Sequence, residues 1–138
     1  MKNIERIVED NIVYAIVINS NYFPEKTEFV TSNEDLQQLG FIVYEAGSQI
    51  RPHTHKPIKR IINRTTETLI VKTGKVEYQI YNNKEVLIAK GILNNGDIIS
   101  LLDGGHGFNI IDDAIMIEVK QGPYTDTSKD KKGLKQYE

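Results

Sequence analysis

Three histidines, at positions 53, 55 and 106, are the only imidazole side chains in this chain of 138 residues. His53 and His55 are two residues apart, and on a β-strand that spacing directs both side chains to the same face. Neutral imidazole is a good ligand for Zn, Fe, Ni, Cu and Mn ions, so the pair can bind a transition metal. The alternative is that both histidines are solvated or hydrogen-bonded side chains on an edge strand.

Glycines and one acidic residue flank the histidines at regular spacings. Five residues separate Gly47 from His53, and six residues separate Glu67 from Gly74. Further along, Gly96 begins a strand-like run that ends in Gly104-Gly105-His106. This pattern resembles the bipartite signature of the cupin superfamily, and the resemblance covers about residues 41–119.

The resemblance implies a fold and a metal centre. Cupins are small antiparallel β-barrels of the jelly-roll type that hold a metal inside the barrel, and they usually form homodimers. Carried over to this chain, the metal ligands would be His53, His55, Glu67 and His106, and the ion would be Zn, Fe, Ni or Mn. The family's gap between the second His and the Glu is shorter than residues 56–66 here, but that stretch contains no Asp or Glu.

The sequence after Gly104 points to one subgroup of the cupins. The stretch from Gly104 to Tyr124 is similar to a small group of single-barrel cupins that are associated with bacterial surface-sugar or nucleotide-sugar gene clusters. Cupins differ widely in activity, so the fold does not fix the function.

Three functions are compatible with such a centre. The first is a metal-dependent isomerase or epimerase acting on a small oxygen-rich molecule, with the ion as a Lewis acid and a nearby base moving the proton. The second is an Fe-dependent dioxygenase. The third is a non-catalytic cupin that binds a small ligand. We favour the first of these.

Other side chains are candidates for substrate binding and catalysis. Arg60 and Arg64 lie on the long segment after the His pair, and guanidinium groups bind carboxylate or phosphate well; the alternative is a solvated basic loop. Tyr78, Glu118 and Lys120 are catalytic candidates. Glu118 and Lys120 share one face of a strand, and they are candidate acid–base groups if that face points inward or a surface pair if it points outward.

The elements that would position these residues are almost all β-strands. Short runs rich in β-branched residues alternate with turn residues, as in a sandwich or barrel. The sequence predicts an all-β, single-domain barrel over residues 1–124, which the resemblance implies is a cupin-type antiparallel β-barrel (jelly roll), followed by a polar C-terminal arm at 125–138. The predicted strands are 11–18, 27–31, 40–45, 49–53, 67–73, 75–81, 85–93, 97–102, 107–111 and 114–120, with the last two forming a hairpin over Asp112-Asp113.

Composition excludes several classes of protein. The formal net charge is −2, so the chain lacks the excess of Lys and Arg that binds nucleic acid nonspecifically. It has no cysteine, which excludes disulfides and thiol chemistry and suits a reducing cytoplasm. The longest apolar run, residues 12–18, is too short to cross a membrane. We therefore expect a cytoplasmic protein that binds neither nucleic acid nor a membrane. The resemblance to cupins adds a small-molecule ligand or substrate and a second copy of the chain as expected partners.

Overall fold

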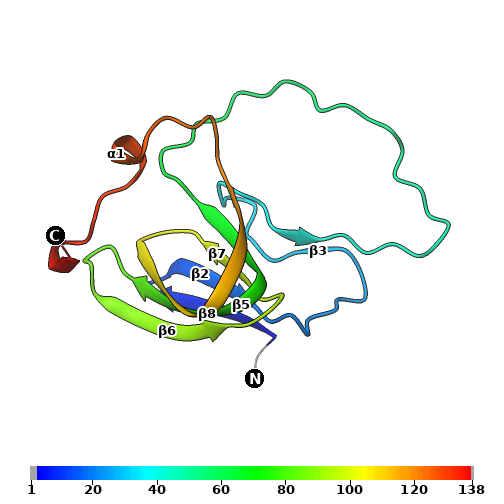
Figure 1. Cartoon of the computed structure of the whole chain (residues 1–138). Coiled ribbons are helices and arrows are strands. Elements are labelled where there is room, and N and C mark those ends of the chain that lie inside the picture. Colours follow the sequence, from blue (N-terminus) through cyan, green and yellow to red (C-terminus); the bar gives the residue numbers. More distant parts are fainter. Residues whose placement is uncertain (1–2, 138) are drawn as a thin grey trace. The chain divides into compact units, whose positions relative to one another are not determined.

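The computed structural model describes residues 3–137, and their regular secondary structure is almost entirely β-strand (Figure 1). The strands are β1 (Ile4–Glu9), β2 (Ile12–Ile18), β3 (Glu28–Phe29), β4 (Gly40–Phe41), β5 (Glu67–Tyr81), β6 (Leu87–Leu93), β7 (Ile98–Leu101) and β8 (Gly105–Lys120). A four-residue helix α1 (Thr127–Asp130) and a 3-10 turn η1 (Lys135–Tyr137) follow. The all-β prediction is confirmed. None of these helices is long and apolar enough to cross a membrane.

The chain divides into two compact units. Met1–Tyr22 and Thr65–Glu138 form one, called here the sheet unit, and Phe23–Arg64 form the other, called here the inserted unit. The boundaries expected for the barrel, 1–124, and for the arm, 125–138, stay predictions.

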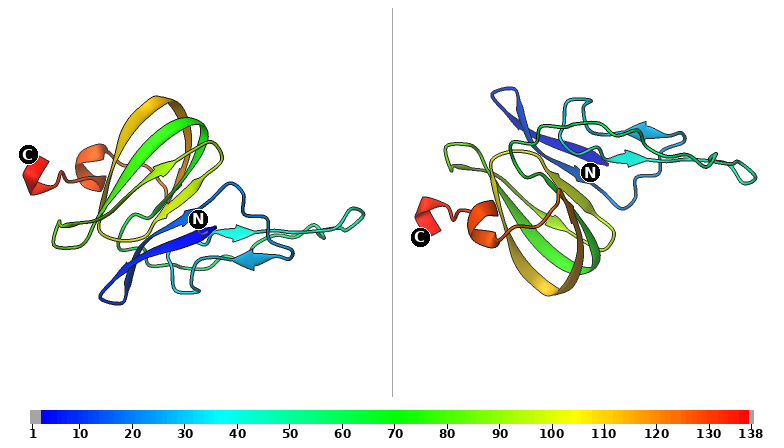
Figure 2. Two further views of the ribbon diagram at one scale, coloured as in Figure 1. Left: turned by 90° about the horizontal axis from the view of Figure 1, so that it is seen from below. Right: turned by 90° about the horizontal axis from the view of Figure 1, so that it is seen from above.

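The sheet unit contains a single six-stranded antiparallel sheet. Its order is β1-β2-β7-β5-β6, and β8 pairs with β5 along the whole length of that strand. The sheet is strongly curled into a half-barrel, and β5 and β8 curve side by side through it (Figures 1 and 2). The inner side of the curl holds the hydrophobic core, whose fully buried members include Val71, Val76, Ile80, Leu93 and Ile99.

β5 and β8 are longer than the sequence predicts. The two strands expected on either side of Gly74 are one strand of 15 residues, and the hairpin expected over Asp112-Asp113 is one strand of 16 residues. That hairpin prediction is wrong because both halves of β8 find their hydrogen-bonding partner in the same strand, β5. Where the sequence predicts a break, the pairing of β5 with β8 shifts register between Val71 and Val76.

Gly74 lies at the centre of this irregular region. Its φ is +109°, a left-handed conformation that side chains disfavour, and an added Cβ would lie 2.4 Å from the backbone oxygen of Asp113. The irregularity also changes which positions of β5 face inward. Val71 is buried before it, whereas Val76 and Ile80 are buried after it, so inward positions change from odd to even numbers.

The first strand was not expected from the sequence. β1 pairs with β2 through a two-residue turn at Asp10-Asn11, where φ is 51° and 63°. Positive φ at both turn residues matches the twist of a tight hairpin, and Asp and Asn tolerate it. Only Ile7 of β1 is buried, so the strand does not show the regular alternation of buried and exposed residues.

The inserted unit has little regular structure. Its two strands, β3 and β4, pair over two residues each. The strand predicted at 49–53 is absent, and residues 42–66 contain no helix or strand. Within this unit the segment has no neighbouring strand to accept its backbone hydrogen bonds, which is why its β-like composition does not produce a strand.

Candidate functional site

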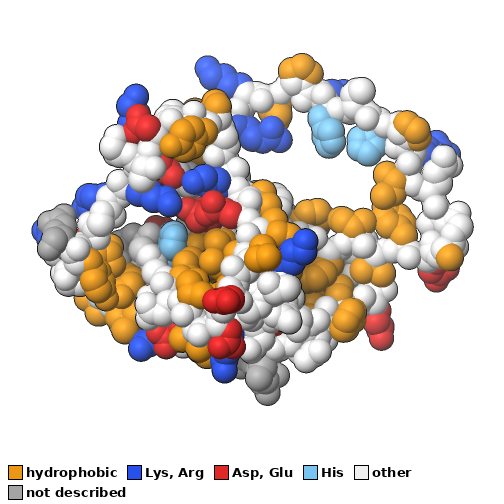
Figure 3. Space-filling view, viewed as in Figure 1, with side chains coloured by type: hydrophobic (Ala, Val, Ile, Leu, Met, Phe, Trp, Pro, Cys, Tyr) orange, Lys and Arg blue, Asp and Glu red, His pale blue; other side chains and the backbone are white. Residues whose placement is uncertain are grey.

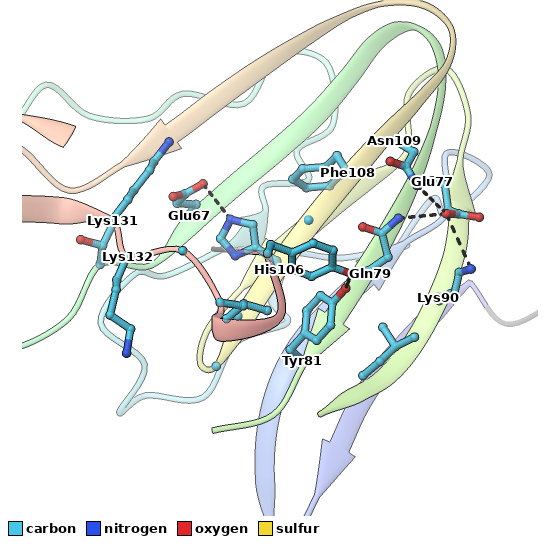
Figure 4. Close-up of a pocket in the computed structure, with 18 of the residues that line it drawn as sticks. Glu67, Glu77, Gln79, Tyr81, Lys90, His106, Phe108, Asn109, Lys131 and Lys132 are labelled. Atoms are coloured by element: carbon cyan, nitrogen blue, oxygen red, sulfur yellow. Dashed lines mark hydrogen bonds and ion pairs between the residues drawn. The ribbon is translucent and has the colours of Figure 1, made fainter. Parts of the chain in front are cut away.

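A cavity of about 790 Å³ lies in the sheet unit (Figure 4). Its walls come from β5, β6, β8 and the segment that follows β8, residues 121–137, called here the C-terminal strap. Glu67 and His106 both line it, together with the polar side chains of Gln79 and Asn109. This volume is within the range of small-molecule sites, roughly 300–1,000 Å³.

The register of β5 and β8 places the acidic and basic candidates on the inner face. Glu67 pairs with Lys120, and Leu69 pairs with Glu118. Directly opposed residues of antiparallel strands lie on the same face, and Leu69 belongs to the buried core. Glu118 and Lys120 therefore share the inner face with Glu67, although Glu118 remains exposed because the half-barrel is open beside it.

The curl of the sheet brings the two ends of β8 to the same carboxyl group. His106 and Glu118 are twelve residues apart on β8 and would be about 40 Å apart on a flat strand. In the structure Glu118 hydrogen-bonds the side chain of Glu67, and the Nε2 atom of His106 lies 3.8 Å from the Oε2 atom of Glu67 (Figure 4).

Glu67 is the most perturbed acid of the site. Its side chain is buried, and this burial, helped by the hydrogen bond and the negative charge of Glu118, raises its pKa to about 7. Lys120 and Lys131 act in the opposite direction by favouring the charged carboxylate. Glu67 therefore exists in both protonation states near neutral pH.

His106 is shifted towards its neutral form. Burial and the positive charge of Lys131 lower its pKa, while Glu118 opposes them. The His106–Glu67 contact is thus not a strong ion pair at neutral pH, because the imidazole is mostly neutral and the carboxyl is partly protonated. The cavity is thus lined by a carboxyl group whose pKa is about 7 and by an imidazole whose pKa is lowered from its usual value.

Asp130 of the strap joins this group of side chains. Its Oδ1 atom accepts a hydrogen bond of 2.6 Å from the hydroxyl of Thr65, and its Oδ2 atom lies 3.5 Å from the Nζ atom of Lys120. These contacts lower the pKa of Asp130, the Thr65 bond most strongly. The pKa of Lys120 is raised, chiefly by Glu118.

The remaining sequence candidates lie elsewhere. Tyr78 is buried in the core, with its hydroxyl against Gly91, and does not line the cavity. His53 and His55 lie in the inserted unit, both exposed, with ring centroids 5.2 Å apart, and His53 Nδ1 is 2.8 Å from the carbonyl oxygen of Arg51. Arg60 and Arg64 are exposed in the same unit.

The four residues expected as metal ligands form two pairs, one in each unit. Glu67 and His106 are together in the sheet unit, and His53 and His55 are together in the inserted unit. Over residues 3–137, no three His, Asp or Glu side chains form a group that could hold a metal ion.

Sequence reasoning missed the contribution of the strap. Asp130, Lys131, Lys132, Gly133, Leu134 and Tyr137 all line the cavity. The sequence of the strap is polar and has no periodicity, so no pattern predicted that it lines a cavity. The one signal in the sequence was the cluster of charged residues at 129–132.

Comparisons with known proteins do not assign the chain to a family. No protein-family model matches the chain, and no curated protein or solved structure matches it.

Proposed function

We propose that the cavity of the sheet unit is the active site of an enzyme that moves protons on a small oxygen-rich molecule, such as a sugar or nucleotide-sugar derivative. The observation that carries the proposal is that Glu67 and His106 line one cavity and lie 3.8 Å apart, while Glu118 hydrogen-bonds the carboxyl group of Glu67. Isomerases and epimerases of this kind need a base and a hydrogen-bond donor close together beside the substrate.

The two lining groups suit complementary roles. The ionised carboxylate of Glu67 would remove a proton from a carbon next to a carbonyl group, and the electron pair of that C–H bond would move to the carbonyl oxygen. Neutral His106 would donate a hydrogen bond to the oxygen as its charge grows. Return of the proton from Glu67 to the same or the neighbouring carbon completes an epimerisation or an isomerisation without any net change in protons.

Glu118 and Lys120 act on Glu67 and not on the substrate. Neither lines the cavity, but the carboxyl of Glu118 bonds that of Glu67, and the charges of both residues change its pKa. They are positioning and tuning residues for the base.

The experiment is exchange of carbon-bound hydrogen with solvent deuterium, followed by NMR on a panel of sugars, sugar phosphates and nucleotide sugars. We expect exchange in at least one compound with the parent protein, and at least a hundredfold loss in Glu67→Gln and His106→Ala. Glu5→Gln, an exposed acid on β1, is the matched control and should exchange at the parent rate. Equal exchange in Glu67→Gln and parent protein would overturn the assignment.

A metal centre is the second candidate, and one observation favours it. The 3.8 Å separation of His106 Nε2 and Glu67 Oε2 lets both atoms reach one ion at about 2.1 Å each. We propose that these two residues, with His53 and His55, bind one Zn, Fe, Ni or Mn ion. Such an ion would polarise a substrate carbonyl, or support oxygen chemistry if it is Fe, as in a dioxygenase.

Metal analysis separates the candidates. We expect close to one equivalent of a transition metal in the tag-free protein by mass spectrometry, and its loss in His53→Ala and in His106→Ala. Less than a tenth of an equivalent after growth and dialysis with each of the four metals would refute the metal centre and leave the acid–base proposal standing. Tight binding of a panel compound without exchange would favour a non-catalytic binding protein.

A further inference from the structure

Part of the cavity wall is the face of β5 that points away from the hydrophobic core. Val76, Tyr78 and Ile80 are buried in the core, so the alternating side chains of Glu77 and Gln79 point to the opposite face. Both of these side chains line the cavity. This face of β5 therefore presents polar groups to the cavity.

The neighbouring strands add two polar side chains to the same face. Asn109 of β8 is directly opposite Glu77, and Lys90 of β6 is directly opposite Gln79. Gly107 of β8 is the other neighbour of Gln79. Directly opposed residues of antiparallel strands share a face. Four side chains that line the cavity thus form one group, called here the polar cluster: Glu77, Gln79, Lys90 and Asn109.

The carboxylate of Glu77 organises the polar cluster (Figure 4). Its Oε1 atom accepts hydrogen bonds from the amide groups of Gln79, at 2.9 Å, and of Asn109, at 3.1 Å, and it lies 3.9 Å from the Nζ atom of Lys90. The bond from Gln79, followed by that from Asn109, lowers the pKa of Glu77. Because a carboxylate only accepts, each amide directs its nitrogen to Glu77 and keeps its oxygen for another donor.

The two amide oxygens are unused acceptors beside open space. No donor among residues 3–137 bonds the Oε1 atom of Gln79 or the Oδ1 atom of Asn109. Gly107 is half-buried, and a Cβ placed there would lie 2.8 Å from the Oε1 atom of Gln79. Apart from its chain neighbours, no other residue would be within 4 Å of that Cβ. A ligand group can therefore approach the acceptors at the position where β8 has no side chain.

The C-terminal strap adds apolar and aromatic groups beside the polar cluster. A Cβ placed at Gly105 would lie 3.2 Å from the Cδ2 atom of Leu134, and the hydroxyl of Tyr137 lies 2.8 Å from that of Tyr81. Tyr81 and Gly105 are directly opposed in the sheet. The strap begins at α1, where acidic and basic side chains gather on the surface (Figure 3). Apolar and aromatic walls with a few fixed polar groups are typical of small-molecule sites.

The charges of the polar cluster favour a neutral ligand. The carboxylate of Glu77 repels an anion, and the ammonium group of Lys90 repels a cation. Hydroxyl groups can donate to the two amide oxygens and can accept from Lys90. A rigid ring that carries several hydroxyl groups would make several of these bonds at once.

We propose that the polar cluster binds the hydroxyl groups of a neutral sugar ring. The inference rests on the proposed function, which it deepens by naming the part of the substrate that is recognised and the residues that recognise it. Gln79 and Asn109 accept hydrogen bonds from the ring, Lys90 donates to it, and Glu77 fixes the orientation of both amides.

The test is an NMR titration of the ¹⁵N-labelled full chain with the methyl glycosides of glucose, galactose and mannose. We expect at least one glycoside to shift the side-chain amide signals of Gln79 and Asn109. Asn109→Ala removes an acceptor and Gly107→Val fills the open space, so each should weaken binding about fivefold or more. Asn83→Ala is the matched control, since Asn83 is an exposed amide outside the cavity, and its affinity should equal that of the parent.

Two kinds of result would overturn the inference. Unshifted amide signals with all three glycosides at about 50 mM, or parent affinity in either variant, would exclude the polar cluster. Larger shifts with phosphate or methylammonium at the same concentration would exclude a neutral ligand. Gln79→Ala replaces either variant if its melting curve shows that it is unfolded.

Failure of the acid–base proposal is seen separately. Glu67→Gln should bind the glycoside as the parent does, because Glu67 is not part of the polar cluster, while deuterium exchange in that variant tests the base. Exchange that depends on Glu67, together with unshifted amide signals, would leave the proposed function standing without the sugar site.

Discussion

Glu67 illustrates how a single carboxyl group acquires an unusual protonation equilibrium from its neighbours. Burial removes water from the carboxylate, and the adjacent Glu118 adds a like charge and a hydrogen bond. Both effects favour the protonated form, and the nearby lysines compensate only in part. The consequence can be measured as a dependence of folding stability on pH.

Glu67 should make the folded protein less stable as pH rises from about 4.5 to about 7. Its pKa is about 7 when folded and near the ordinary value of 4.5 when unfolded, so in this window the folded state binds more protons than the unfolded state. Urea unfolding across this range should show a loss on the order of 2 kcal/mol in the parent relative to Glu67→Gln. Parallel pH profiles for parent and variant would contradict the assignment.

Glu118 should be one cause of the raised pKa of Glu67. In Glu118→Gln the like charge is removed, so we expect the pKa of Glu67 to fall while burial keeps it above 4.5. The pKa can be followed by NMR of the carboxyl carbon. Glu5→Gln on β1 should leave it unchanged, and an unchanged value in Glu118→Gln would show that burial acts alone.

At the scale of elements, the β5–β8 pair determines the site. These strands carry the Glu67–Lys120 and Leu69–Glu118 pairs at one end and the Ile80–His106 pair at the other. The irregular pairing around Gly74 lets both strands bend and keeps their apolar positions facing the core on either side of the bend.

Replacing Gly74 should therefore destabilise the sheet unit. Gly74→Ala combines a disfavoured positive φ with a Cβ only 2.4 Å from a backbone oxygen, and we expect a loss of about 2 kcal/mol or more. Gly133→Ala, where a Cβ has open space, should cost less than about 0.5 kcal/mol. Urea denaturation measures both, and equal stabilities would refute the role of the bend.

At the scale of the whole molecule, the two units differ in regular structure. Residues 42–66 contain no helix or strand, and Lys59, Arg60 and Arg64 are exposed there. Limited trypsin digestion should cut after Lys59 or Arg60 before it cuts after Lys72 or Lys75 in β5, because a protease cleaves most readily in exposed segments without regular secondary structure. Earlier cleavage in β5 would contradict the fold of the sheet unit. Added Zn²⁺ should slow the cuts in the inserted unit if the proposed metal centre forms.

We propose that exposed apolar side chains of β8 form the contact of the expected homodimer. Among the described residues β8 pairs with β5 alone, and four of its apolar side chains are 46–59% exposed: Ile111, Ile115, Ile117 and Val119. Such a strand favours association with another copy. Light scattering should give twice the 15.7 kDa of one chain, and Ile117→Lys should halve that mass.

The matched control for the dimer is Val86→Lys. Val86 is an exposed apolar residue of the turn between β5 and β6, so the charge should leave the mass at that of the dimer. A monomeric parent protein would end the homodimer expectation and leave the exposed residues of β8 without a partner.

Much of this fold follows from the sequence itself. Alternation in residues 75–81 correctly placed Val76, Tyr78 and Ile80 on one buried face, and the all-β prediction is confirmed. Alternation also predicted that Glu118 and Lys120 share a face, because the side-chain period of a strand is a local property of its backbone. The strand expected at 49–53 failed because a strand needs a partner, which is not a local property.

Only the tertiary structure decided which of these residues meet. Glu67 and His106 are 39 positions apart, and His106 and Glu118 are at opposite ends of one strand, so no local pattern relates them. The curl of β5 and β8 brings Glu67 and His106 to one cavity, with Glu118 bonded to Glu67, and the strap lines the rest of that cavity. The physical reason is that curl and strand pairing come from packing of the whole sheet, whereas the sequence specifies directly only the identity and alternation of the side chains.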